Sequence, residues 1–357
     1  MPQALIATAP RVAELRTYRD RSLARNEILV EVDFASPKHG TELVDFRGLN
    51  PFDREKYDPE WRAFMARDKD ETPAVVFGEW NPGNMWVGRV VELGADVSAF
   101  SIGDRVCSYG GIRETQIVRA VDNFRLRKVP EGVSPKAAVC YDPAQFALGG
   151  VRDALLRPGD AACVFGLGAI GLLAVQMIRA IGTGTLVVVD PITRRRELAL
   201  EYGADLALDP SDPATDVGLE LKRATDKRGV DAVVETSGHG SALQAALRGL
   251  AYGGRISYVA FSKVIDDLRL GREAHFNAAE LVFSRAASEP NRDHPRWDRK
   301  RIEDACWDML VRGRLDCERI VDPVVPFAVS AEGFMRYVDR SPELAVKLGV
   351  EFGRSVP

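Results

Sequence analysis

The sequence predicts an α/β protein in which a doubly wound parallel sheet follows a domain rich in strands. Four short apolar runs in the middle of the chain have the length of buried strands, and helical patterns lie between them. Strands that alternate with helices form a parallel sheet covered on both faces. The runs comprise residues 161–165, 186–189, 232–235 and 256–259, with helical patterns at 168–181 and 194–202.

The first part of the chain, up to about residue 125, reads instead as strands and turns. Residues 27–34 alternate apolar and polar side chains like a half-buried strand, and 87–93 form a second strand. The pair Gly103-Asp104 marks a turn before a third strand at 105–107. The polar, aromatic stretch 50–72 is predicted to be a loop with a short helix. Residues 302–352 are predicted to add a helix, a strand, a second helix and a final strand.

Composition excludes several classes of protein. The chain has 357 residues, 46% of them hydrophobic and 28% charged, with a formal net charge of −4. This length favours two domains. The slightly negative net charge gives no indication of a surface that binds nucleic acid or an anionic membrane. No apolar run reaches the roughly 18 residues of a membrane helix, and the N-terminus lacks a signal-peptide pattern. The five cysteines are scattered without a CxxC pair, so we expect a cytoplasmic protein with reduced thiols.

A glycine-rich motif of the pattern GxGxxG follows the first buried strand and opens the first helix. It consists of Gly166, Leu167, Gly168, Ala169, Ile170 and Gly171. The first glycine permits a tight turn, the second lets the backbone approach a pyrophosphate, and the third lets helix and strand pack closely. The helix N-terminus offers N–H groups and a positive dipole to phosphate. The motif therefore predicts a dinucleotide site; the alternative is a glycine-rich turn without a ligand.

Asp190 indicates which dinucleotide is bound. It ends the next strand, 19 residues after Gly171, where a carboxylate can bind both ribose hydroxyls and would repel a 2′-phosphate. Arg195, within the arginine run 194–196, could instead accept such a phosphate. The alternative is that these arginines form the solvated face of a helix. We favour NAD over NADP.

Six short segments, taken in order, resemble the medium-chain dehydrogenase/reductase superfamily, which includes the zinc-type alcohol and sorbitol dehydrogenases. They are GTE at 40–42, GRVVELG at 88–94, GDRV at 103–106, PGD at 158–160, EYGAD at 201–205 and GGR at 253–255. The resemblance implies a GroES-like catalytic domain, a distorted β-barrel formed by residues 1–150 and 291–357, with a Rossmann domain inserted at 151–290. It also implies an active site in the cleft between these domains, with Ser237 on the nicotinamide side. Related proteins form homodimers or homotetramers through the edge of the Rossmann sheet, here expected at 256–259 and 264–270.

The chain departs from the zinc-dependent relatives at the metal positions. His39 stands in place of their cysteine ligand, Asn84 and Met85 replace the histidine and glutamate of their second motif, and Asp142 replaces a later glutamate. Catalytic zinc needs three protein ligands, whereas His39 and Asp142 supply at most two and methionine is a poor zinc ligand. Glu79 is a third candidate only in another register. The closely spaced cysteines of a structural zinc site are also missing, so we expect a zinc-independent enzyme with no bound metal.

Without zinc, a side chain must take the hydroxyl proton as the hydride leaves. The resemblance brings six candidates to the vacated site: Lys38, His39, Thr41, Glu42, Tyr141 and Asp142. We expect His39 and Thr41 to form a relay, because histidine titrates near neutrality and strand alternation would return Thr41 to the same side. Tyr141 is the main rival. The alternatives are that His39 holds a satisfied hydrogen bond, Tyr141 packs in the core, Glu42 bonds nearby backbone, and Lys38 is solvated.

Two further segments indicate a polar substrate. Donors and acceptors beside tryptophans suit a polyhydroxylated molecule, since hydroxyls accept hydrogen bonds and aromatic faces cover C–H surfaces. The predicted contacts are Asn84, Trp86, Arg292, His294 and Trp297. A sugar, glycoside or cyclitol is the leading substrate class; the alternative for 284–301 is an exposed loop with solvated charges.

Three functions compete at this point. The first is an NAD-dependent oxidoreductase that acts on a secondary alcohol or ketone. The second is a redox-neutral sugar eliminase or epimerase that uses NAD through a transient ketone, and release of NADH separates the two. The third is a non-catalytic NAD-binding protein, which any turnover would exclude. We expect the first.

Overall fold

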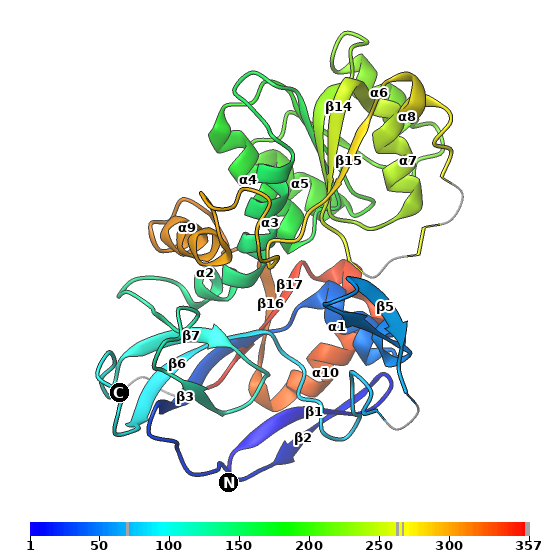
Figure 1. Ribbon diagram of the computed structural model, residues 1–357. Coiled ribbons are helices and arrows are strands. Elements are labelled where there is room, and N and C mark those ends of the chain that lie inside the picture. Colours follow the sequence, from blue (N-terminus) through cyan, green and yellow to red (C-terminus); the bar gives the residue numbers. More distant parts are fainter. Residues whose placement is uncertain (69–70, 262–263, 266–267, 354–357) are drawn as a thin grey trace. The chain divides into compact units, whose positions relative to one another are not determined.

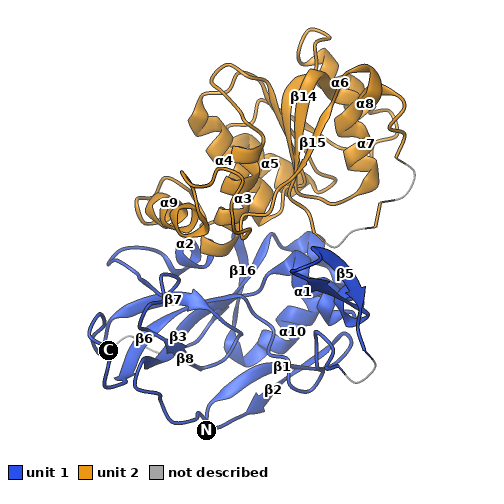
Figure 2. Cartoon of the chain, in the orientation of Figure 1, with its two compact units in different colours: residues 1–139, 321–357 blue, residues 140–320 orange. Residues whose placement is uncertain are grey.

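The computed structural model describes residues 1–68, 71–261, 264–265 and 268–353. The chain forms two compact units (Figure 2): unit 1 comprises Met1–Val139 and Val321–Pro357, and unit 2 comprises Cys140–Ile320. The sequence predicts domain boundaries at 150 and 290, and the functions assigned to those domains remain predictions. The longest described helices have 13 residues, so no helix in the described part of the chain could span a bilayer.

Unit 2 contains the predicted doubly wound parallel sheet, which confirms the fold class (Figure 1). Every neighbouring pair of its strands is parallel. The central strands are buried along their whole length because helices cover both faces. The strand order is β12 (Leu206–Leu208), β11 (Leu186–Val189), β10 (Ala162–Phe165), β13 (Val230–Glu235), β14 (Leu250–Tyr258) and β15 (Glu280–Phe283).

The helices of unit 2 divide between the two faces of this sheet (Figure 1). One face carries α3 (Tyr141–Asp153), α4 (Ala169–Ile181) and α5 (Thr193–Glu201). The other face carries α6 (Val217–Arg223), α7 (Gly240–Gly249) and α8 (Glu273–Phe276). A last helix, α9 (Arg299–Val311), packs against α3.

The edge strand of the sheet is β15. The prediction of an edge at 256–259 and 264–270 is wrong, because residues 256–258 belong to β14, which pairs with β13 on one side and β15 on the other. Residues 266 and 267 lie outside the described residues, and no strand is found at 264–265 or 268–270. β15 pairs with β14 in parallel from Arg255↔Glu280 to Tyr258↔Phe283, and an ion pair of 2.8 Å joins Arg255 to Glu280. The sheet therefore ends at the last strand that forms backbone hydrogen bonds with a neighbour, and apolar residues in the sequence do not by themselves mark this strand.

Unit 1 is built on a seven-stranded, mostly antiparallel sheet. The predicted strand at 27–34 is β3 (Glu27–Ser36), whose buried residues alternate as expected. The order is β16 (Val321–Pro326), β17 (Lys347–Glu351), β3, β6 (Met85–Leu93), β7 (Arg105–Tyr109) and β9 (Arg127–Lys128), with β8 (Thr115–Arg119) paired to β3. A separate hairpin joins β1 (Gln3–Ala9) to β2 (Val12–Thr17). β17 pairs with β3 at Val350↔Ala35, so residues 315 positions apart share one sheet.

Short helices complete unit 1. The most relevant to function is α1 (His39–Phe46), which directly follows β3. The others are α2 (Pro135–Val139), α10 (Ser330–Phe334), a π-helical segment η3 (Met335–Arg340) and the 3₁₀ turns η1 (Pro51–Asp53), η2 (Phe327–Val329) and η4 (Pro342–Leu344). Phe46 of α1 meets Phe334 edge to face at 5.0 Å, which fixes α1 against the C-terminal helices.

The stretch 50–72 contains more structure than the predicted loop. The short helix is present as η1, but a hairpin of β4 (Glu55–Asp58) and β5 (Ala63–Ala66) follows it. Tyr57 and Phe64 face each other across this hairpin at 5.4 Å, and Asp58 accepts backbone N–H bonds at its turn. Cross-strand aromatic pairing stabilises such a hairpin, and it was missed because the strands are only four residues long.

Candidate active site

The glycine-rich motif forms the turn between β10 and α4. Gly166 has a φ of +84°, and a Cβ there would lie 2.8 Å from the nitrogen of Ser237. Gly168 caps α4 without help from a side chain, and a Cβ on it would meet nothing within 4 Å. A Cβ on Gly171 would lie 1.9 Å from the carbonyl oxygen of Gly166. The turn therefore leaves open space at a helix N-terminus, which fits a pyrophosphate.

Asp190 lies against this turn, and its role toward a ribose remains a prediction. It is buried directly after β11, and its Oδ2 accepts the Leu167 N–H at 2.7 Å while Oδ1 accepts the Ile192 N–H at 2.8 Å. Each carboxylate oxygen keeps a second lone pair. The side chain can therefore hold the turn and still accept a hydroxyl of a bound ribose.

Two polar residues that the sequence analysis did not single out hold the same turn. Thr236 donates from Oγ1 to the carbonyl of Gly166 at 2.8 Å. Glu235, which is fully buried at the end of β13, accepts the N–H groups of Ser237 at 2.9 Å and Gly238 at 3.0 Å. Their position in the sequence could have predicted this role, because Glu235 ends a buried strand and Thr236 follows it, at the carboxyl edge of the sheet where dinucleotides bind.

The arginine run lies at the start of α5. Arg196 donates to the Asp190 carbonyl at 2.7 Å and forms an ion pair with Asp209 at 3.0 Å. This guanidinium therefore stabilises the backbone at Asp190. Arg195 is half-buried on the same helix, and its contact with the cofactor remains a prediction.

In unit 1, the segment that carries His39 and Thr41 is helical. The strand alternation expected for the relay is therefore wrong, because residues two apart on an α-helix point roughly 200° apart. His39 Nε2 accepts the Leu348 N–H at 2.8 Å. An accepting nitrogen carries no proton, so neutral His39 carries it on Nδ1. This bond favours the alternative of a satisfied histidine, whereas Thr41 is half-buried on α1.

Glu42 is a buried carboxyl group in the first turn of α1. Its Oε1 accepts the Lys38 N–H at 2.7 Å, and its Oε2 accepts the Gly83 N–H at 2.9 Å. Burial raises the pKa of Glu42 to about 7, although these two backbone bonds and the charge of Lys347 act to lower it. Carboxyl groups with a strongly shifted pKa occur frequently at functional sites. Lys347, which lowers this pKa, was not predicted from the sequence to have a role.

Tyr141 and Asp142 belong to unit 2. Tyr141 is fully buried, its hydroxyl donates to Glu303 at 2.7 Å, and its ring meets Trp307 edge to face at 5.4 Å. These contacts tie α3 to α9 and favour the packing alternative for Tyr141. Asp142 is also buried and accepts a bond from Gln145 at 3.3 Å.

The two residues predicted around β6 differ in what they can bind. Trp86 is fully buried, and its indole N–H donates to the Tyr109 carbonyl at 3.0 Å, so packing accounts for it without a sugar contact. Asn84 is half-buried, and its Nδ2 atom is buried without a hydrogen-bond partner among the described residues. A buried amide group of this kind is available to a ligand or a water molecule, which favours its predicted role.

The predicted substrate segment 284–301 packs against the end of α3 within unit 2. Guanidinium groups of Arg152 and Arg301 lie 3.7 Å and 4.3 Å from the ring centre of Trp297. Arg292 contacts Asp153 at 3.6 Å, and His294 is exposed. Cation–π contacts occupy the aromatic surface that a sugar would need, so these contacts favour the loop alternative for this segment.

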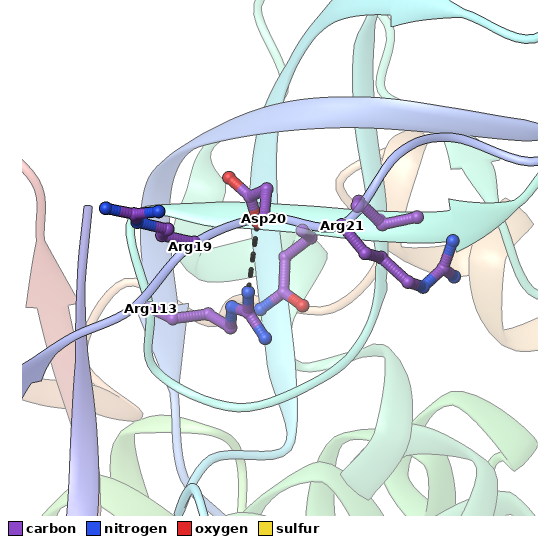
Figure 3. Close-up of a pocket in the computed structure, with 6 residues that line it drawn as sticks. Arg19, Asp20, Arg21 and Arg113 are labelled. Atoms are coloured by element: carbon purple, nitrogen blue, oxygen red, sulfur yellow. Dashed lines mark hydrogen bonds and ion pairs between the residues drawn. The ribbon is translucent and has the colours of Figure 1, made fainter. Parts of the chain in front are cut away.

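Unit 1 also contains a polar pocket (Figure 3). Arg113 donates to Asp20 at 3.2 Å and stacks on Tyr18 at 4.0 Å. None of the predicted site residues lines this pocket, whose walls are Arg19, Asp20, Arg21, Arg113, Gln116 and Ile117. Among the residues that the structure describes, no three His, Cys, Asp or Glu side chains form a group that could hold a metal ion.

Comparisons with known proteins identify the relatives of this chain. A family model described as zinc-binding dehydrogenase matches residues 169–289. The D-guloside 3-dehydrogenase of Escherichia coli K12 is 54% identical over 349 residues, which cover 98% of this chain and 99% of that protein.

Solved structures of low sequence identity share the fold. An alcohol dehydrogenase from Escherichia coli CFT073 in complex with NADH has a TM-score of 0.74 at 19% identity, and covers 98% of this chain and 99% of its own. A zinc-binding dehydrogenase from Sinorhizobium meliloti bound to NADP has a TM-score of 0.75 at 18% identity, with the same coverage. The prediction of a dehydrogenase acting on CH–OH groups is confirmed by the high-identity relative. The chain therefore belongs to the medium-chain dehydrogenase/reductase superfamily.

Proposed function

We propose that the protein is an NAD-dependent, zinc-independent dehydrogenase that acts on a secondary alcohol of a sugar-like substrate or on the corresponding ketone. The observation that carries this proposal is the 54% identity to a D-guloside 3-dehydrogenase over nearly the full length of both chains. The open turn at Gly168 and the carboxylate of Asp190 support a nicotinamide dinucleotide.

The chemistry divides between the cofactor and the chain. Bound NAD would accept or return the hydride. The turn 166–168 and Asp190 would hold the dinucleotide, and Asn84 offers its unpartnered amide N–H to a substrate oxygen. The hydroxyl proton needs an acceptor, and Glu42 is the predicted candidate whose pKa, at about 7, suits that task near neutrality.

The test is a panel of glycosides, free sugars and polyols with NAD, followed by NADH absorbance. We expect steady NADH formation with at least one glycoside. Substrate conversion without net NADH would favour the redox-neutral eliminase or epimerase, and absence of any conversion would contradict the proposal.

Replacing Asp190 by alanine should reveal the cofactor preference. Loss of one charged hydrogen-bond acceptor costs on the order of 1.5–3 kcal/mol, so NAD affinity should fall roughly ten- to a hundredfold. Discrimination against NADP should relax, because the charge that repels a 2′-phosphate is gone. Direct binding titrations with both cofactors check this. Asp209→Ala, which removes the ion-pair partner of Arg196 and the acceptor of two bonds from Ser211 but leaves the Asp190 carboxylate in place, is the control. A wild type that prefers NADP would refute the assignment.

Elemental analysis tests zinc independence. The match to zinc-binding dehydrogenases spans 169–289, a segment that contains neither His39 nor Asn84 nor Asp142. We expect purified protein to contain far less than one zinc per chain and to keep its activity after treatment with a chelator. About one zinc per chain, or loss of activity on chelation that zinc restores, would contradict this prediction.

We also propose a homodimer joined through β15, working in the cytoplasm. This edge strand exposes Phe283 (67%) and Leu281 (37%), and unpaired edges with apolar side chains favour association. Phe283→Asp should convert a dimer to a monomer in light scattering. Leu344→Asp, an exposed position in unit 1, is the control, and a monomeric wild type would rule the interface out. The five cysteines are all buried free thiols, which suits a reducing compartment.

A further inference from the structure

An asparagine with no role in the functions considered so far holds the four residues that precede β6. Asn81 donates from Nδ2 to the carbonyl of Leu5 at 2.6 Å and to the carbonyl of Ile112 at 3.1 Å. The amide nitrogen has two N–H groups, so these two carbonyls occupy both of them. The segment 81–84 is therefore tied at its start to β1 and to the loop 110–112.

The segment 81–84 also packs directly against the loop 110–112. Ile112 donates its N–H to the carbonyl of Pro82 at 2.8 Å, and a Cβ on Gly83 would lie 2.5 Å from that nitrogen. Gly83 has a φ of +135°, a conformation that favours glycine. A Cβ on Gly111 would collide with Oδ1 of Asn81. The two segments thus leave no free space between them, and a change at Asn81 is transmitted along the backbone of 81–84.

The last residue of the segment is Asn84, whose backbone is fixed while its side-chain amide has an unused donor. Its N–H donates to the carbonyl of Ser36 at 3.1 Å, its carbonyl accepts the Gly110 N–H at 3.1 Å, and Glu42 accepts the N–H of the preceding Gly83 at 2.9 Å. Nδ2 of Asn84 is buried without a hydrogen-bond partner among the described residues. Buried polar atoms are nearly always paired, so a fixed residue with an unused donor is suited to hold a ligand.

We propose that Asn81 is a positioning residue, which holds the segment 81–84 so that Asn84 donates its amide N–H to one hydroxyl of the substrate. This bond makes the enzyme selective for substrates that carry the hydroxyl, because a substrate without it leaves the amide unpaired. The inference rests on the proposed function for its sugar-like substrate, whereas the tie between Asn81 and the segment does not depend on that function. Asn81 does not touch the substrate, since both of its N–H groups are occupied.

The kinetic experiment is a double-mutant cycle at saturating NAD, with a glycoside that the panel identifies as a substrate. Asn84→Ala removes the donor and should lower kcat/KM by about ten- to a hundredfold, and Asn81→Ala should lower it by about tenfold. Because Asn81 acts through Asn84, the double variant should lose no more than Asn84→Ala alone. NAD affinity should be unchanged in all three. Losses that multiply in the double variant would overturn the inference, because a merely structural role of Asn81 would give that result.

Selectivity is measured with deoxy analogues of the same glycoside, each of which lacks one hydroxyl. The wild type should discriminate against one particular analogue by about ten- to a hundredfold. Asn84→Ala should lose this discrimination and keep its response to the other analogues. Asn123→Ala is the matched control, because the Asn123 amide donates to the Arg119 carbonyl at 2.8 Å elsewhere in unit 1, and it should behave like the wild type. Discrimination that Asn84→Ala retains against every analogue would contradict the proposal.

A further measurement needs no substrate. Hydrogen exchange at the backbone N–H groups of Asn84 and Gly110, whose bonds fix Asn84 on both sides, reports how firmly the segment is held. Exchange at both should be about tenfold faster in Asn81→Ala and unchanged in Asn123→Ala. If Asn81→Ala does not fold, Asn81→Ser, which keeps a shorter donor, replaces it in both experiments. If the wild type converts no glycoside, the proposed function fails while this measurement still tests the role of Asn81, and unchanged exchange would refute that role.

Discussion

Replacing Glu42 by glutamine is expected to lower kcat by about 10²–10⁴-fold, the usual contribution of a general acid or base. Glutamine keeps the shape and one acceptor oxygen but cannot take a proton. The acidic limb of the pH profile, expected near the Glu42 pKa of about 7, should disappear with it. Stopped-flow and steady-state measurements from pH 5 to 9 would detect both effects, with NAD affinity unchanged.

The same substitution should remove a pH dependence of the protein's stability. The pKa of Glu42 rises from 4.5 to about 7 on folding, so between these values the folded chain holds a proton that the unfolded chain has lost. Wild-type stability therefore decreases as pH rises through this window, by on the order of 3 kcal/mol. Glu42→Gln carries no titrating group here, so this pH-dependent loss should disappear from its Tm between pH 4 and 8. Its amide NH2 would face one of the two backbone N–H groups that Glu42 accepts, so at pH 4 its Tm should lie below that of the wild type.

A control separates these effects from general damage. Glu114 accepts the Gln3 N–H at 2.7 Å elsewhere in unit 1, and Glu114→Gln should change neither kcat nor its pH profile. A buried carboxylate that lowers the stability of the fold but is needed for turnover would be typical of a catalytic group, because functional sites often sacrifice stability for activity. If Glu42→Gln keeps both the rate and the limb, the proton acceptor must be sought elsewhere, first at His39.

Gly171→Ala is expected to abolish NAD binding, with a loss of more than about 100-fold in affinity. The new Cβ would lie 1.9 Å from the carbonyl oxygen of Gly166, which is backbone and cannot rotate away. Helix α4 must then move away from the turn 166–168, and the N–H groups proposed to bind the pyrophosphate would move with it. Overpacking of this kind also costs roughly 1–3 kcal/mol of stability, so calorimetry and thermal melts should both respond.

Two further glycines make this prediction specific. Gly271 has open space around a Cβ and no left-handed φ, so Gly271→Ala should leave binding and stability unchanged. Gly168→Ala should leave the fold intact, because its Cβ meets no atom within 4 Å, but should weaken NAD binding where the ligand would approach. Normal NAD affinity in Gly171→Ala would exclude the turn as the cofactor site.

The sequence was informative wherever structure depends on neighbours along the chain. The turn at Gly166–Gly171 and the strand that ends before Asp190 follow from local spacing, and the structure brings them together as expected. The alternation in β3 likewise predicts its buried face. These features need only the period of a strand or helix and the conformational freedom of glycine.

The candidate site in unit 1 depends on distant partners, which spacing does not reveal. Nothing near His39 indicates that Leu348 occupies its Nε2, and nothing near Pro37 indicates a bond from Lys347. Similarly, the pairing of Tyr141 with Glu303 spans 162 positions. Residue types were therefore enough to propose His39 as a candidate, but not to show that its Nε2 is already occupied. That follows only from the pairing of β17 with β3, which brings Leu348 next to it.

The pairing of β17 with β3 also has a consequence for synthesis on the ribosome. β3 emerges early, whereas β17 emerges only after all of unit 2 has been translated. Until then β3 lacks one neighbour, and an unpaired strand edge can recruit other chains. Unit 2, which is continuous in sequence, can fold while the edge of β3 is still unpaired. Chaperone demand and aggregation of nascent chains should therefore concentrate in the interval before residues 347–351 leave the exit tunnel.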